Sequence, residues 1–252
     1  MTNTVDVKKA GSLATQFAND SGSGFEEADS SAYAIPFIQI LQSGSPQCKK
    51  SDGAYIKGAS EGMLYNTVTQ EMVDGDAGLT VIPVHYTQRY NEWAPRETGG
   101  GFVGEHAVDN LPLTTKDERG RDVTEAGNLL VDTRNHYVMI VGADGSLSPA
   151  LVSISSSQLK KSRQWMSKMQ GIKIKHPETG AFNTAPMYSR LYKLKTVPES
   201  NDKGSWFGYS VELIGEVTDV AQYNAAIEFR NSVKQGASVA KHEEPVTSKD
   251  KF

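Results

Sequence analysis

The order of extended and helical segments from residue 77 onward constrains the fold more than any other feature of the sequence. A long segment, 77–95, is rich in the β-branched and aromatic residues that favour strands. Residues 129–155 follow with two or three further strands, and Ala143-Asp144-Gly145 is a hairpin-turn sequence within them. The pattern then predicts a helix over 158–170, followed by strands at 172–176, 187–197 and 205–217.

This order predicts a mostly β protein with short helices, of the α+β class. Three strands, a helix and two closing strands are the layout of the OB fold, a five-stranded Greek-key barrel with one helix before its fourth strand. A last helix over 220–235 is predicted behind Asp219, whose carboxylate suits the first position of a helix. An OB-like barrel presents an open face and loops that bind oligonucleotides.

Composition along the chain predicts one domain with two extensions. Residues 1–30 are rich in Ser, Gly, Asn and Asp, so we expect a disordered N-terminal arm. Residues 31–235 form a single OB-like, β-rich domain that contains a long polar and Gly-rich loop near 96–128. Residues 236–252 have few apolar side chains and predict a disordered C-terminal tail that ends in Phe252.

Charge is distributed unevenly, and this points to a polyanionic partner. The chain carries a formal net charge of −4, yet residues 157–195 contain nine basic residues and one acidic residue. Screening limits an electrostatic field to roughly 8–10 Å, so the local excess matters more than the total. Such a basic patch suits nucleic acid. The alternative is that it pairs with the acidic surface of residues 33–156, which is the commoner use of a charge run.

The predicted helix over 158–170 places its apolar residues on one side. At 100° per residue, Leu159, Ser162, Met166 and Met169 fall within one arc, and Trp165 lies at the boundary of that arc. Trp165 can therefore complete the core or line a groove beside the basic surface. The candidate phosphate contacts on the helix and just after it are Lys160, Lys161, Arg163, Lys168, Lys173 and Lys175.

Aromatic and basic residues alternate on the strand that follows. Tyr188, Arg190 and Tyr192 share one predicted face, whereas Lys193 and Lys195 share the other. Rings beside cations suit the stacking of unpaired bases, which a duplex hides. The alternative is that these rings are ordinary core residues. A second set of candidates with the same character lies in 77–95 and consists of Tyr86, Arg89, Tyr90 and Trp93.

These residues resemble those of single-stranded DNA-binding proteins encoded by bacteriophages. The similarity is carried by "YSRLYKLKTVPESNDKGSWFGYSVELIGEV", residues 188–217, and by the segments "GMLYNTVT" and "VIPVHYTQRYNEW". It implies an OB barrel, binding of single-stranded DNA, and a role in replication. Proteins of this kind commonly end in an acidic tail with a terminal aromatic residue that recruits replication proteins. Phe252 fits that role, but "HEEPVTSKDKF" is not acidic on balance.

Signals for enzymes, cofactors, metals and membranes are weak. Gly99, Gly101 and Gly104 match a dinucleotide-binding spacing, but the residues after them do not begin a helix. The five histidines show no metal-ligand spacing, and the single Cys48 excludes an intramolecular disulfide and a thiolate zinc cluster. No apolar run is long enough to span a membrane. We therefore expect a cytoplasmic protein without a cofactor, metal or membrane partner.

The sequence favours a non-enzymatic single-stranded DNA-binding protein that acts in phage DNA replication or recombination, with strand annealing as a further activity. Its predicted partners are single-stranded DNA and, through the C-terminal tail, replication proteins. One alternative is a virion structural or decoration protein with a similar β-rich body. A second is a metal-dependent nuclease that uses Glu105, Asp132 and Asp144. The oligomeric state is left open.

Overall fold

The computed structural model describes residues 7–28, 32–202 and 204–236, and the chain divides into two compact units, residues 1–33 and 34–252. Within its described residues the first unit contains one helix, α1 (Val7–Asn19), followed by turns. The sequence predicts a disordered arm here, and α1 is the helical part of that segment. Its sequence, VKKAGSLATQFAN, has no Pro and a single Gly, so nothing in it strongly opposes a helix.

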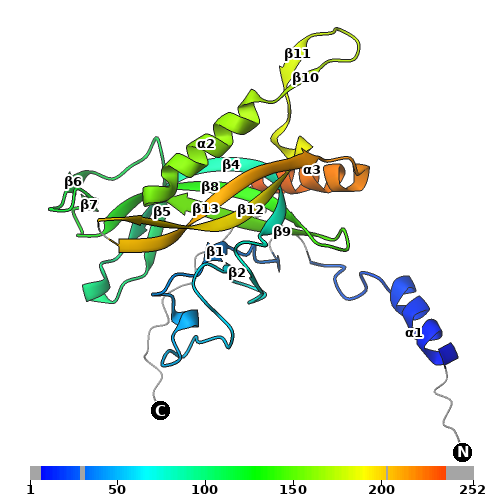
Figure 1. Cartoon of the computed structure of the whole chain (residues 1–252), viewed down its shortest axis with the longest axis horizontal. Helices are drawn as coiled ribbons and strands as arrows, with labels where there is room; N and C mark the ends of the chain where they lie inside the picture. The colour runs from blue at the N-terminus through cyan, green and yellow to red at the C-terminus, as the bar shows by residue number, and fades with distance from the viewer. Residues whose placement is uncertain (1–6, 29–31, 203, 237–252) are drawn as a thin grey trace, which may run out of the picture. The chain divides into compact units, whose positions relative to one another are not determined.

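The second unit is mostly β and is built around an eight-stranded antiparallel sheet (Figure 1). Its strand order is β13-β12-β4-β8-β7-β6, while β5 pairs with β4 and β9 pairs with β8. The strands are β4 (Leu79–Trp93), β5 (Phe102–Ala107), β6 (Thr114–Lys116), β7 (Asp122–Thr124), β8 (Leu129–Val141), β9 (Leu147–Ser155), β12 (Arg190–Asn201) and β13 (Gly204–Glu216).

Helix α2 (Leu159–Gly171) occupies the place where this sheet would otherwise close on itself. Within the described residues β9 and β13 are not paired with each other, so the sheet is curled but open. α2 contacts β8, β9 and β13 and so covers the gap between the two edges. The long strands and α2 follow the predicted order as β4, β8, β9, α2, β12 and β13, with β5–β7 and β10–β11 inserted between them. The mostly β class is confirmed, whereas the sheet is an open half-barrel and the OB-like Greek-key barrel is not confirmed.

Two buried clusters lie on opposite faces of the sheet, because alternate residues of a strand point to opposite sides. Val138 belongs to the inner cluster, which α2 covers, whereas its neighbour Tyr137 belongs to the outer cluster. Helix α3 (Val220–Lys234) covers the outer cluster with Phe229. The predicted cap of this helix is confirmed, since Ala221 N donates a 2.7 Å hydrogen bond to Asp219 Oδ1.

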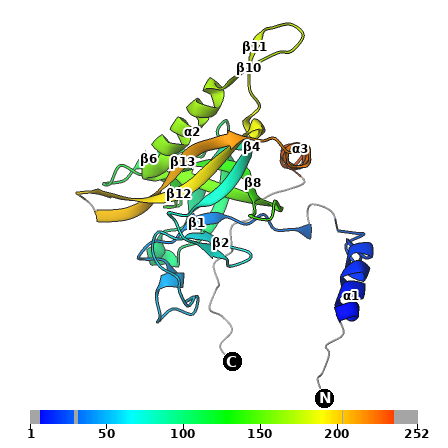
Figure 2. The same ribbon diagram turned by 45° about the vertical axis from the view of Figure 1, so that its right-hand side comes forward.

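Smaller elements complete the second unit. β1 (Ile38–Ile40), β2 (Leu64–Asn66) and β3 (Met72–Val73) form a three-stranded sheet, and β10 (Lys173–Lys175) pairs with β11 (Phe182–Thr184). Figures 1 and 2 show that the β10–β11 hairpin projects from the body as an arm. Short 3₁₀ helices are η2 (Pro46–Cys48), η3 (Arg96–Thr98), η4 (Ser156–Gln158) and η5 (Met187–Ser189).

The stretch predicted to be a long loop, residues 96–128, contains β5, β6 and β7, so that prediction is wrong in part. β4 and β8 are long strands that pair with each other as far as Trp93 and Leu129, and the outer edge of each takes a further short strand there. β5 pairs there with β4, where Trp93 lies opposite Phe102, and β7 pairs with β8, where Asp122 lies opposite Leu130. Besides backbone pairing, polar and charged side-chain pairs such as Arg89 with Glu105 and Lys116 with Asp122 join these strands, so their sequences carry little of the apolar pattern that predicts a strand.

Candidate nucleic-acid interface

Helix α2 packs against the sheet through its three buried residues, Ser162, Trp165 and Met169. Their spacing of three and four residues places them on one side. The Trp165 side chain is only 1% exposed and stacks on His136 with ring centroids 4.5 Å apart. Trp165 is therefore a core residue and cannot be a stacking platform for a base. The sequence places Trp165 at the edge of the buried face of α2, whereas in the structure Trp165 lies at the centre of that face.

Tyr192 also lies in the core, so its predicted role as a stacking platform is wrong. The ring is 0% exposed and packs edge-on against Trp165, with centroids 5.7 Å apart. Tyr192, Leu194 and Thr196 are alternate residues of β12, and all three are buried. Tyr188 is not on the strand at all, because η5 ends at Ser189 and β12 begins at Arg190.

The opposite side of α2 is exposed and basic. Lys160, Arg163 and Lys168 are exposed, and within the described residues none of them forms an ion pair with a carboxylate. A shallow hollow of about 400 Å³ is lined by Lys160, Arg163, Gln164, Ser167 and Lys168. Lys168 Nζ donates a 3.4 Å hydrogen bond to the backbone oxygen of Val211, which positions its side chain towards β13.

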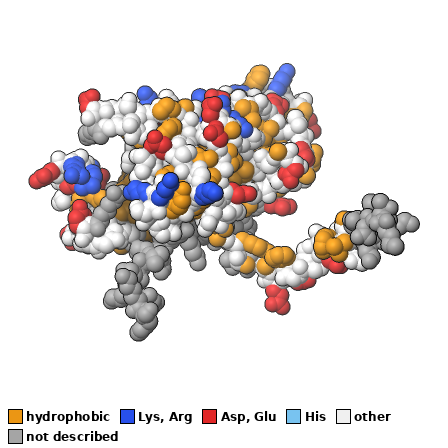
Figure 3. Space-filling view, turned by 60° about the horizontal axis from the view of Figure 1, so that its bottom comes forward, with side chains coloured by type: hydrophobic (Ala, Val, Ile, Leu, Met, Phe, Trp, Pro, Cys, Tyr) orange, Lys and Arg blue, Asp and Glu red, His pale blue; other side chains and the backbone are white. Residues whose placement is uncertain are grey.

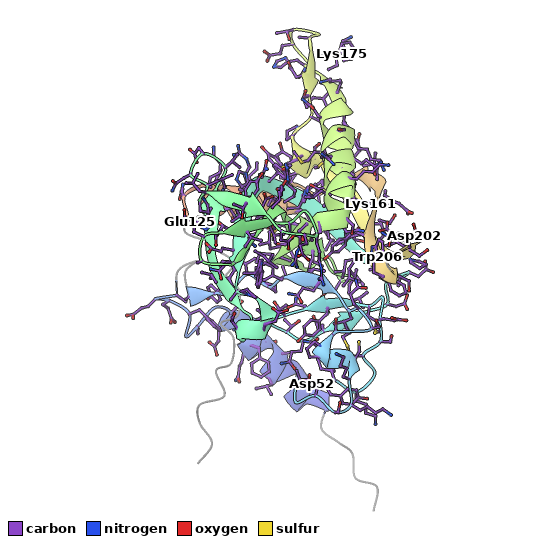
Figure 4. All side chains as sticks on the ribbon, turned by 90° about the vertical axis from the view of Figure 1, so that its left-hand side faces the viewer. Asp52, Glu125, Lys161, Lys175, Asp202 and Trp206 are labelled. Atoms are coloured by element: carbon purple, nitrogen blue, oxygen red, sulfur yellow. The ribbon has the colours of Figure 1, made fainter. Side chains whose placement is uncertain are left out.

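The arm continues this basic surface. β10 begins two residues after the end of α2, and its Lys173 and Lys175 are exposed. Lys173 Nζ donates a 2.7 Å hydrogen bond to Thr184 Oγ1 on β11. Figure 4 shows Lys161 near the start of α2 and Lys175 far out on the arm. On the face of the body that Figure 3 turns to the viewer, by contrast, basic and acidic side chains are interspersed.

Several predicted cations are already paired with carboxylates. Lys161 Nζ lies 3.0 Å from Glu199 Oε1. Arg190, Lys195 and Arg89 pair with Glu216, Glu212 and Glu105 at 2.9, 3.6 and 3.0 Å. Lys193 is half-buried and lies opposite Glu212 in the β12–β13 ladder. The predicted basic run therefore divides into unpaired cations on α2 and the arm, and cations next to acids on the sheet.

The remaining predicted rings are half-buried, and most of them contact other side chains. Tyr188 lies 5.3 Å from the ring of Tyr223. Tyr86 Oη accepts a 2.8 Å hydrogen bond from Arg134 Nη1, and Trp93 packs edge-on against Phe102 at 5.4 Å. Tyr90 lies opposite His106 and Asp132 in the sheet. None of these rings is on α2 or the arm, the elements that carry the unpaired cations.

Residues 7–239 match the model of a family described as Pam3 phage gp34-like protein. The chain belongs to this family. The match confirms the phage origin that the sequence resemblance predicts, while binding of single-stranded DNA stays a prediction. No curated protein matches the chain, and no solved structure does. Phe252, the predicted partner contact, lies outside the described residues of this family member.

Glu199 is an acidic residue that lies next to the basic surface of this phage protein, and the sequence does not predict it there. Its Oε2 accepts hydrogen bonds from Gln158 Nε2 and, at 3.0 Å, from Trp206 Nε1, while Oε1 pairs with Lys161. Burial raises the pKa of Glu199, but the hydrogen bonds and the charge of Lys161 outweigh burial and leave the pKa below its usual value. Glu199 is therefore charged at neutral pH and neutralises Lys161. Figure 4 shows Lys161 and Trp206 on the same side of the body.

The residues proposed for a nuclease do not come together. Glu105 pairs with Arg89, Asp132 pairs with Arg134 at 2.7 Å, and Asp144 lies in the turn between β8 and β9. The described residues contain no group of three or more His, Cys, Asp or Glu side chains that could hold a metal ion. In the described part of the chain, no helix is long and apolar enough to cross a membrane.

Two other groups of polar side chains contain residue types that occur in catalytic sites. His136 Nε2 and Ser162 Oγ share a 2.7 Å hydrogen bond, but both residues are buried and no substrate can reach them. A hollow of about 370 Å³ is lined in part by Glu92 and Glu125, and Glu92 bonds His106 at 2.8 Å. Figure 4 shows Glu125 on the other side of the body from Lys161, so this acidic hollow is separate from the basic surface.

Proposed function

We propose that the protein binds single-stranded DNA in the cytoplasm of the phage's host, during replication or recombination of phage DNA, with strand annealing as a further activity. The observation that carries the proposal is the unpaired basic surface formed by α2 and the arm. This surface presents Lys160, Arg163, Lys168, Lys173 and Lys175 to solvent. Cations without carboxylate partners are free to neutralise phosphates, which is the main source of affinity for nucleic acid.

The order of the strands supports the proposal. The strands lie side by side as β9-β8-β4-β12-β13, and α2 stands between β9 and β12 in the chain. A barrel of the OB type has its helix at that place and binds oligonucleotides on its open face and loops. Fold alone does not establish a function, so the charged surface carries the proposal and the strand order supports it.

We expect the salt dependence of binding to identify the surface. Each phosphate neutralised on a single strand contributes about −0.7 to the slope of log K against log salt. Changing Lys160, Arg163 and Lys168 together to Ala should make the slope for oligo(dT) shallower by about 2, with weaker binding at low salt. The measurement is fluorescence anisotropy with labelled oligo(dT) over a salt series, beside a duplex of equal length.

The matched control changes the same amount of charge elsewhere. Lys49, Lys50 and Lys57 are exposed on the loops between β1 and β2, and their triple Ala variant should keep the slope of the wild type. Equal slopes for both triple variants would remove α2 from the site. A wild-type protein that binds neither oligo(dT) nor duplex would favour the alternative of a virion structural or decoration protein, and degradation of the DNA with Mg²⁺ would favour a nuclease.

Glu199→Gln is expected to strengthen binding. The substitution removes the negative charge beside Lys161 but keeps an amide that can bond Trp206, so the local geometry is preserved. Lys161 can then reach a phosphate, and the salt slope should become steeper by about 0.7. The double variant Glu199→Gln with Lys161→Ala should lose that gain. A single variant with the slope and affinity of the wild type would show that Lys161 lies outside the binding path.

A further inference from the structure

The arm has one face on which a single ring lies beside two lysines. In the antiparallel β10–β11 pair, Lys175 lies directly opposite Phe182, and Lys173 lies opposite Thr184. Directly opposed residues of antiparallel strands project to the same side, so these four side chains share one face. Ile174 and Asn183 form the middle pair and project to the other side.

Phe182 is exposed although it is a large apolar ring. The residue is 74% exposed. Neither the core nor the pairing of the arm requires an aromatic residue at this position, because the backbone hydrogen bonds of the hairpin do not depend on it. An exposed ring of this kind marks a binding surface when other recognition groups stand beside it.

The local structure holds Phe182 in a defined position. The tip is closed by hydrogen bonds from His176 N to Ala181 O at 2.8 Å and from Gly180 N to His176 O at 2.9 Å. At the base of the arm, Ala185 N donates a 2.9 Å hydrogen bond to Ile172 O, and Ala185 is buried. The ring is therefore carried by a hydrogen-bonded hairpin whose base is attached to the body.

We infer that Phe182 is the residue that stacks on an unpaired base, while Lys175, directly opposite it, and Lys173, two residues along the same strand, contact neighbouring phosphates. This inference rests on the proposed function and names the ring that selects single strands. Trp165 and Tyr192 cannot have that role, because both are buried. Opposed side chains of antiparallel strands have Cβ atoms roughly 5 Å apart, so the ring and the Lys175 ammonium group lie within the span of one nucleotide. Because a duplex buries its base faces, such a ring favours single strands.

The surroundings of the ring favour a nucleic acid over a protein partner. Protein interfaces are centred on clusters of apolar side chains and are depleted of lysine. Phe182 instead shares its face with two lysines and a threonine, and the exposed apolar neighbour, Ile174, lies on the opposite side. Aromatic side chains beside a positively charged surface are the combination by which proteins bind single strands without regard to sequence.

The test compares oligo(dT) with an abasic oligomer of the same length and charge, using the full chain. Phe182→Ala should weaken binding to oligo(dT) about tenfold, because stacking on one base is lost. It should leave the salt slope and the affinity for the abasic oligomer unchanged, because the ring carries no charge. Phe182→Trp should retain binding. Ile174→Ala, on the other face of the same hairpin, is the matched control and should bind as the wild type does.

The outcomes separate the inference from the proposed function. If the wild type binds oligo(dT) and Phe182→Ala binds equally well, the stacking role is wrong and the proposed function stands. A wild type that binds no single strand removes both. If Phe182→Ala instead changes the mass of the protein in light scattering and keeps its affinity for oligo(dT), the ring is a contact between copies of the chain. Circular dichroism of each variant checks that the exposed substitutions leave the fold intact.

Discussion

Replacing Trp165 with Ala is expected to lower the free energy of unfolding by about 3–5 kcal/mol, as removal of a large buried ring does. The side chain is 1% exposed, stacks on His136 and packs edge-on against Tyr192. It also holds α2 in the gap between β9 and β13, so its loss leaves a cavity where the open sheet has no strand pairing to compensate. Chemical denaturation of wild type and variant measures the difference.

The control lies two residues earlier on the same helix. Arg163 is exposed and faces away from the core, so Arg163→Ala should change the free energy of unfolding by no more than about 0.5 kcal/mol. If Trp165→Ala does not fold, Trp165→Phe keeps part of the ring and should show a smaller loss in the same direction. Should Trp165→Ala unfold at the same denaturant concentration as the wild type, the buried position of this ring would be contradicted.

The protein is expected to lose about 2 kcal/mol of its free energy of unfolding between pH 8 and pH 5 through His136 alone. Burial and the nearby charge of Arg134 lower the pKa of His136 to about 3 in the folded state. Unfolding exposes the ring and restores its ordinary pKa near 6.5. Below that pH the unfolded state binds a proton that the folded state does not. Stability is therefore complete above pH 6.5 and falls as the pH decreases toward 3.

A variant that cannot titrate isolates this contribution. His136→Gln keeps a polar group beside Ser162 and should be less stable than the wild type at pH 7, but its stability should fall less between pH 8 and pH 5. Burial, with smaller effects from nearby cations, also lowers the pKa of His85, so His85 adds to the slope in both proteins and cancels in the comparison. His176→Gln on the arm is the control. Parallel curves for wild type and His136→Gln would contradict the burial of a neutral imidazole.

The sequence predicts those elements whose signals are local. The β-branched run gives β4, the Ala143-Asp144-Gly145 turn gives the β8–β9 hairpin, and Asp219 gives the start of α3. Each signal is contained in a few neighbouring residues, so it needs no knowledge of the rest of the fold. The basic character of α2 is likewise a property of one segment.

The orientation of side chains was harder to predict because distant strands decide it. Whether Trp165 points inward depends on the gap between β9 and β13, which the local periodicity of α2 cannot reveal. Whether the face of β12 that carries Tyr192 is buried likewise depends on α2, because Trp165 of that helix packs against the Tyr192 ring. The sequence does not predict Phe182 as a binding residue for a related reason. Its neighbours in the sequence show no apolar alternation, and only the pairing of β10 with β11 reveals that Phe182 lies beside Lys175.

The burial of α2 along one side has a consequence for the entropy of binding. Since Ser162, Trp165 and Met169 fix the helix to the sheet, the backbone that carries Lys160, Arg163 and Lys168 is already ordered before a ligand arrives. Only the rotamers of the long side chains remain to be restricted, at a cost of roughly 0.5–1.5 kcal/mol for each one immobilised. A disordered basic segment of the same composition would also have to order its backbone. The helical surface therefore loses less conformational entropy when it binds a ligand.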